Sequence, residues 1–136
     1  MKNYASYLLI VFFAFVCVNF AKSTNPASFA GIIEQVAASL NAHDAASLAA
    51  SFDNSLEVTI LDKESNYSRA QAEVVVRDFF NKVNPSSFKL NHQGNSPDGS
   101  MYGTGILNCS LGAIRVYYYT KQKGGRYFIQ ELRFEK

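Results

Sequence analysis

Cysteine and histidine are scarce in this chain of 136 residues, which contains two of each. A zinc site takes about four ligands, most often from these residue types. Because Cys17 lies in an apolar N-terminal run that we expect to be removed, Cys109, His43 and His92 are too few. We therefore expect no metal site and no cofactor. Cys109 is predicted to be a small buried strand residue rather than a nucleophile, and a disulfide between two copies of the chain stays open.

A strong excess of one charge is also absent. The formal net charge is +2, and Lys2 lies in the N-terminal segment that we expect to be lost. Because a nearly neutral protein does not attract nucleic acid through its overall field, we expect no nucleic-acid partner. The sequence also lacks a glycine-rich phosphate loop after a strand and a serine in a nucleophile-elbow pattern. These absences disfavour several common classes of enzyme.

The first 22 residues have the pattern of a secretory signal peptide. Lys2 supplies an early positive charge, and residues 8–18 form a continuous apolar run. This run is shorter than the roughly 20 apolar residues of a spanning helix, so an uncleaved membrane anchor is the weaker alternative. We expect cleavage after Ala21 or, as a second choice, after Ser23, and one domain over residues 23–136. The mature protein is then periplasmic or extracellular, in a bacterial envelope, with no membrane span.

Helical patterns come first in the remaining chain. Apolar residues at helical spacing predict a helix over residues 29–40. Asp44 is expected to cap a short second helix that continues through Leu48 and Phe52. Ser68 is expected to cap a third helix, which ends near Asn84 because the residue before a proline avoids the helical conformation.

Strand patterns dominate the second half. Alternating residues predict strands over residues 56–60, 88–92, 101–110, 113–121 and 126–135. Polar clusters predict turns at residues 53–55 and 62–66. The short connections between the last three strands force antiparallel hairpins. Helices grouped on one face of an antiparallel sheet make an α+β domain.

Several segments together carry a resemblance to a known family. They are residues 67–73 and 78–80 of the third helix, residues 88–94, Tyr102 with Gly105 and Leu107, residues 115–117 and residues 129–133. In these the chain resembles the domain of unknown function 4783 family of small exported bacterial proteins. The resemblance implies the cone of the nuclear transport factor 2-like, or cystatin-like, fold: three N-terminal helices packed on a curved antiparallel sheet. It implies no activity, because that fold hosts both enzymes and binding modules.

An enzyme with this fold needs an acid or base inside the cone, and His92 is the best candidate base. It shares the alternation of Phe88 and Leu90, so we expect it to face the helices. Tyr102, Asn108 and Tyr118 would supply hydrogen bonds to a ligand or to a developing oxyanion. No carboxylate shares the strand face of His92, and a structural histidine is the stronger interpretation, so we assign no catalytic residue.

The strand over residues 113–121 suggests an interface. One face, with Ile114, Val116, Tyr118 and Thr120, suits packing against the helices. The opposite face is expected to be exposed and to form a contact surface; its members are Arg115, Tyr117, Tyr119 and Lys121, with Arg133 of the last strand in compatible phase. We expect a homodimer contact there, with a glycan or another polyanion, or simply a solvated face, as alternatives.

The sequence thus favours an exported, non-catalytic module. It is expected to bind either a small molecule in the cone or a protein on the sheet face, with a second copy of the chain as the favoured protein partner. The alternative is a small isomerase-like or hydratase-like enzyme whose cone pocket uses His92 as its base.

Overall fold

The computed structural model describes residues 28–136. In this part of the chain the helices are α1 (Phe29–Ala42), α2 (Ala45–Ala49) and α3 (Arg69–Val83). The strands are β1 (Phe52–Ile60), β2 (Lys63–Ser68), β3 (Ser87–Asn95), β4 (Met101–Cys109), β5 (Gly112–Lys123) and β6 (Arg126–Glu135). The predicted signal peptide and its cleavage sites lie outside the described residues. None of the described helices is long and apolar enough to cross a membrane.

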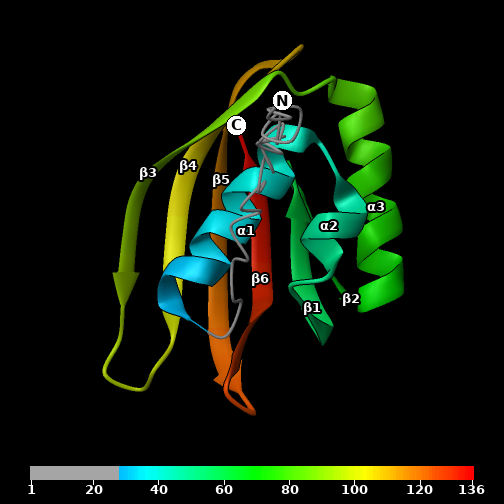
Figure 1. The fold of residues 1–136 in the computed structure, drawn as a ribbon. Helices are drawn as coiled ribbons and strands as arrows, with labels where there is room; N and C mark the ends of the chain where they lie inside the picture. Colours follow the sequence, from blue (N-terminus) through cyan, green and yellow to red (C-terminus); the bar gives the residue numbers. More distant parts are fainter. Residues whose placement is uncertain (1–27) are drawn as a thin grey trace, which may run out of the picture.

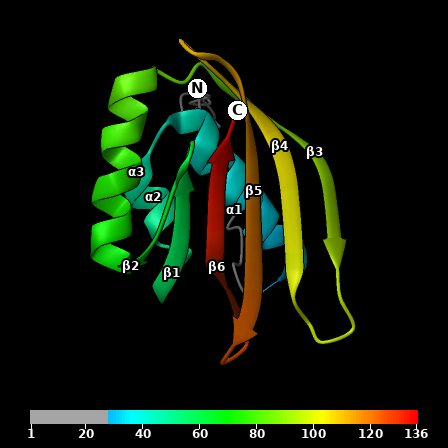
Figure 2. The same cartoon turned by 180° about the vertical axis from the view of Figure 1, so that it is seen from behind.

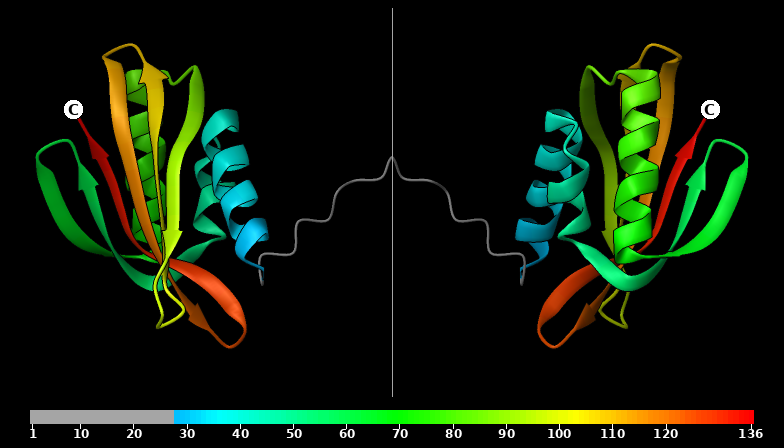
Figure 3. Two further views of the ribbon diagram at one scale, coloured as in Figure 1. Left: turned by 90° about the vertical axis from the view of Figure 1, so that its left-hand side faces the viewer. Right: turned by 90° about the vertical axis from the view of Figure 1, so that its right-hand side faces the viewer.

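The six strands form one curved sheet in the order β2-β1-β6-β5-β4-β3 (Figure 3). All neighbouring strands run antiparallel except β1 and β6, which are parallel, so the prediction of a wholly antiparallel sheet is wrong at this pair. The two strands are far apart in the sequence, and no hairpin fixes their relative direction. The helices cover one face (Figure 1), and the view from behind shows the other face free of described helices (Figure 2). The domain is therefore α+β, with one covered and one outer sheet face.

Local capping explains where the helices begin and end. The Asp44 carboxylate accepts a hydrogen bond from the backbone N–H of Ser47 at 3.0 Å, at the start of α2. Ser68 and Gln71 form a reciprocal capping box at the start of α3. Helix α3 ends at Val83, and the cap residue that follows, Asn84, has a left-handed backbone with φ of 45°. The second helix stops at Ala49, so its predicted extension to Phe52 is wrong.

Both polar clusters predicted as turns prove to be largely strand. Asp53 lies in β1, where it is 7% exposed and accepts hydrogen bonds from Lys123 at 2.5 Å and Gln130 at 3.0 Å. Burial opposes the charge of this carboxylate, but the hydrogen bonds, led by that of Lys123, outweigh it and lower the pKa of Asp53. Residues 63–68 form β2, an edge strand. An edge strand with little burial has no need for apolar alternation, so its pattern resembles a turn.

The core lies between the helices and the inner sheet face. At its centre the fully buried ring of Phe134 lies 5.0 Å from Phe79 and 5.9 Å from Phe80, centroid to centroid. On β4 the inner positions include glycines, and an added Cβ at Gly103 would meet the ring of Tyr118 at 2.3 Å. The glycines therefore let large rings from neighbouring strands fill the concave side of the sheet.

Candidate functional site

His92 does not face the helices as predicted. Leu90 pairs with Gly105 and His92 with Thr104, so Asn91 is an extra residue in β3, a β-bulge. One extra residue moves every later side chain to the opposite face. His92 is exposed and shares the outer face with Thr104. Residues 91–95 are all polar or glycine, so no apolar alternation indicated which face each side chain takes after Leu90.

The other proposed ligand-binding residues are also separated. Tyr102 lies on the outer face, 39% exposed, with its ring stacked on Tyr117 at 6.4 Å between centroids. Asn108 is exposed, and its amide donates a hydrogen bond to the Ser87 hydroxyl at 3.1 Å. Of the four, only Tyr118 lies inside the cone, where it is 0% exposed. The structure therefore does not bring the proposed pocket residues together.

The Tyr118 hydroxyl is buried and has no hydrogen-bond partner among the described residues. Its ring is removed from water, and this burial raises the pKa of Tyr118 to about 12. An unpaired buried hydroxyl costs about 1–3 kcal/mol. The phenol therefore stays neutral at physiological pH and serves mainly as a large filling group.

We expect Tyr118→Phe to raise the free energy of unfolding by about 1 kcal/mol, because it removes the unpaired hydroxyl without changing the shape of the ring. Urea denaturation of the two proteins measures the change. Tyr119→Phe, at a half-buried outer-face position, is the matched control and is expected to be nearly neutral. A clear loss of stability in Tyr118→Phe would mean that the hydroxyl is hydrogen-bonded in solution, as a ligand-binding cone requires.

The predicted interface residues do lie together on the outer face. Tyr117 pairs across the sheet with Thr104 on one side and Arg133 on the other. The Arg133 guanidinium lies 6.0 Å from the centre of the Tyr117 ring, in the range of a cation–π contact. Arg115 and Lys121 are exposed, and Tyr119 is half-buried beside Tyr102. We call this surface, made by Thr104, Arg115, Tyr117, Glu131, Arg133 and Glu135, the outer-face patch.

Charge is concentrated around Arg133 in the outer-face patch. Its guanidinium contacts the Glu131 carboxylate closely and lies 3.6 Å from Glu57 and 3.9 Å from Glu135. Burial opposes the cation, but Glu131 and the other two carboxylates outweigh it and raise the pKa of Arg133. Burial, followed by the charge of Glu131, raises the pKa of Tyr117, so its phenol stays neutral. The patch encloses a shallow depression of about 420 Å³.

The sequence analysis missed the carboxylates of this patch. Glu131 and Glu135 stand two residues on either side of Arg133 in one strand, so alternation alone could have placed all three on one face. Glu57 could not have been found in this way. It reaches Arg133 only through the parallel pairing of β1 with β6, for which the sequence has no local signal.

The described residues contain no cluster of side chains that could bind a metal ion. Across residues 28–136 no three histidine, cysteine, aspartate or glutamate side chains gather as metal ligands. Cys109 is half-buried, with its thiol 3.3 Å from the Gly112 carbonyl oxygen.

Comparison with known proteins identifies the family. Residues 33–135 match the model of the family described as "Domain of unknown function (DUF4783)". Solved structures of that family from Bacteroides uniformis and Bacteroides ovatus are 26% and 24% identical, with TM-scores of 0.72 and 0.71. The first alignment covers 76% of this chain and 94% of the other, and the second covers 75% and 92%.

The wider fold is shared with a protein that carries the NTF2 name and has a long sheet. It is 18% identical, with a TM-score of 0.63 over 79% of this chain and 99% of the other, so the likeness concerns the fold alone. No curated protein matches the chain. The family match spans most of the sequence, and the fold is nuclear transport factor 2-like. The chain therefore belongs to the domain of unknown function 4783 family.

Proposed function

We propose that this chain is an exported, non-catalytic interaction module that forms a homodimer through the outer-face patch. The observation that carries the proposal is the arrangement around Tyr117, where aromatic and oppositely charged side chains lie on a sheet face that no described helix covers (Figure 2). Tyrosine and arginine are, with tryptophan, the residue types enriched at the energetic centres of interfaces. The secretory pattern of the first 22 residues supports export.

Charge on the patch suits pairing with a second copy. A twofold interface places the same surface on both partners, so the surface has to complement itself. Arg133 is surrounded by carboxylates, whereas Arg115 forms no ion pair within the described part of the chain. Two copies related by a twofold axis would bring the free Arg115 of one toward the excess carboxylates of the other. A glycan or another polyanion is less well matched, because Glu131, Glu135 and the neighbouring Glu57 accompany the two arginines of the patch.

The enzymatic alternative has less support from the geometry. A base and its hydrogen-bonding partners have to lie within reach of one substrate. His92 and Tyr118 lie on opposite faces of the sheet, and the inner positions of Gly103 and Gly105 are occupied by the rings of Tyr118 and Phe88. These features favour a filled cone over a catalytic pocket built on His92.

We expect the protein, purified in the form in which cells accumulate it, to have twice the mass of one chain in native mass spectrometry and in sedimentation experiments. Arg115→Glu is expected to weaken self-association at least about tenfold, because it reverses a charge at an interface built from opposite charges. Glu34→Arg, a charge reversal at an exposed position of α1, is the matched control and should leave association unchanged.

A monomer at high protein concentration would contradict the proposed dimer. A monomer that retains a small bound molecule would instead favour ligand binding in the cone. A dimer that Arg115→Glu leaves intact would show that the contact lies elsewhere on the surface.

A further inference from the structure

A second surface, away from the outer-face patch, runs between α3 and the β1–β2 hairpin. In the right-hand view of Figure 3, α3 faces the viewer with the hairpin beside it. Three adjoining depressions line this side of α3, of about 430, 230 and 420 Å³. The first two share Tyr67 and Val75, and the last two share Ile60, Lys63, Phe79 and Lys82. We call this continuous surface the α3 groove.

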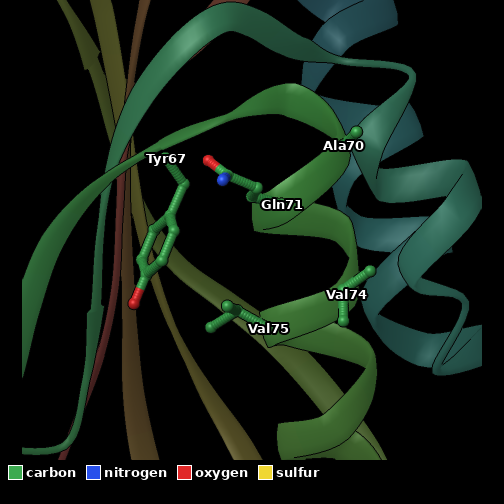
Figure 4. Close-up of a pocket in the computed structure, with 5 residues that line it drawn as sticks. All are labelled: Tyr67, Ala70, Gln71, Val74 and Val75. Atoms are coloured by element: carbon green, nitrogen blue, oxygen red, sulfur yellow. The ribbon is translucent and has the colours of Figure 1, made fainter.

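The groove is mainly apolar at both ends. Figure 4 shows Gln71 and Val75 of α3 pointing toward the ring of Tyr67 from β2 at the first end. Three large apolar side chains are exposed in the described part of the chain, and two of them line the groove. Val74, which is 50% exposed, lies at the first end, and Leu111, which is 44% exposed, lies at the other end. An exposed apolar surface bordered by polar residues is typical of an interaction site.

The middle of the groove is positively charged. Lys63 and Lys82 line both the central and the final depression, accompanied by one carboxylate in each, Asp78 and Asp62. Neither lysine forms an ion pair with any of the described residues. In the central depression the two lysines outnumber the single carboxylate of Asp78, and Asp62 lies only in the final depression, so the centre of the groove favours an acidic group of a partner.

The free edge of the sheet lies beside this groove. Strand β2 is last in the strand order and pairs only with β1 in the described structure. Lys63 and Tyr67 pair with Ile60 and Leu56, so their side chains share the inner face that lines the groove. A strand added to β2 would therefore direct every second side chain toward α3.

The groove is slightly longer than a five-residue extended segment. The groove follows α3 from Gln71 to Val83, which corresponds to about 18 Å of helix. Five residues of a strand extend about 13 Å between the first and the fifth. This is the spacing of Tyr67 and Lys63 along β2, and it is about 5 Å shorter than the groove, so the first and fifth side chains have to extend lengthwise to reach the two apolar ends.

We propose that the α3 groove and the free edge of β2 bind an extended segment of a partner protein. The segment adds as a strand beside β2 and carries apolar, acidic and apolar residues at positions i, i+2 and i+4. With the first and fifth residues at the levels of Tyr67 and Lys63, the acidic residue lies opposite Ser65, where the long side chains of Lys63 and Lys82 meet it from the central depression. A second copy of this chain does not fit, because β2 itself presents only one apolar side chain, Tyr67, on its inner face.

The test is selection of a displayed library of random seven-residue peptides on the purified protein, followed by titration of the enriched peptides. We expect enriched peptides to share the apolar–acidic–apolar alternation and to slow hydrogen exchange of β2 amides, because these amides gain strand partners. Lys82→Glu should weaken binding at least about tenfold, since it places a negative charge against the acidic residue. Lys121→Glu, an exposed lysine on the outer face, is the matched control.

Several outcomes would overturn the proposal. They are the absence of enriched peptides, enrichment of a helical pattern, protection of amides outside β2, and full binding to Lys82→Glu. Val75→Lys adds a charge to the groove floor at a half-buried position and should also weaken binding. Because Lys82 is exposed, Lys82→Glu is expected to fold, so the test does not depend on the more disruptive Val75 variant.

Discussion

Replacing Phe134 with alanine is expected to lower the free energy of unfolding by about 3–5 kcal/mol, the range for truncating a fully buried phenylalanine. The Phe134 ring is 0% exposed and contacts the rings of Phe79 and Phe80 from α3. Its removal leaves a cavity between the sheet and the helix and takes away both aromatic contacts. Because domains of this size are stable by only about 5–15 kcal/mol, a large share of the stability would be lost.

Denaturation by urea, followed by circular dichroism, measures this change. Phe128→Ala is the matched control in the same strand. The Phe128 ring is half-buried, with the Arg126 guanidinium 5.5 Å from its centre, and its removal is expected to cost about 1 kcal/mol or less. Phe134 pairs with the inner-face Val116, and Phe128 pairs with the outer-face Lys121. Equal losses for the two variants would contradict this placement on opposite faces of β6.

Gly105→Ala is expected to destabilise the fold by about 3 kcal/mol, at the upper end of the usual range for overpacking. An added Cβ would lie 2.4 Å from the Lys89 carbonyl oxygen and 2.5 Å from the Phe88 ring. The carbonyl oxygen belongs to the paired backbone of β3, so it cannot move without disturbing the β3–β4 ladder. The expected effect is therefore larger than for a clash with a mobile side chain.

Gly94→Ala distinguishes these two situations. A Cβ at Gly94 would also be too close to a neighbour, at 2.6 Å from Tyr102, but the Tyr102 side chain is 39% exposed, so its ring can move toward water at the cost of its stacking on Tyr117. We expect a loss of about 1 kcal/mol or less, since the added Cβ also restricts the unfolded chain. Thermal unfolding of both variants tests the difference. If Gly105→Ala were as stable as the parent, Phe88 would not be packed over β4, and the cone would be more open.

The packing around the inner glycines also decides whether the cone has room for a ligand. A small ligand needs a concave pocket, which on this sheet could lie only on its concave side. Here Phe88 and Tyr118 cover the inner glycines of β4. The surfaces that remain available are the outer-face patch and the α3 groove, on different sides of the domain, and the two proposals can fail independently. Loss of the dimer would leave the groove intact, and loss of peptide binding would leave the dimer intact.

Some features followed directly from local sequence. Capping by Asp44 and Ser68, the end of α3 before Pro85 and the inner and outer faces of β5 all depend on neighbouring residues. A helix start needs a capping side chain within three residues, and strand faces need only alternation. The family resemblance added the nuclear transport factor 2-like fold, which the family match and the solved structures confirm.

Other features depended on contacts between distant segments. The bulge at Asn91 turns His92 to the outer face. The pairing of β3 with β4 reveals it, because residues 91–95 are polar or glycine and have no apolar alternation. Strand β2 has a polar sequence that resembles a turn, and its pairing with β1 makes it a strand.

The sequence by itself determined the helices, most of the strands, the buried face of β5 and the expectation of export, because each depends on residues close together in the chain. The tertiary structure decided the parallel pairing of β1 with β6, which brings Glu57 to Arg133, and the position of β2 beside α3, which creates the groove. Such strand pairings depend on the packing of the whole core, so a local pattern of residue types does not encode them.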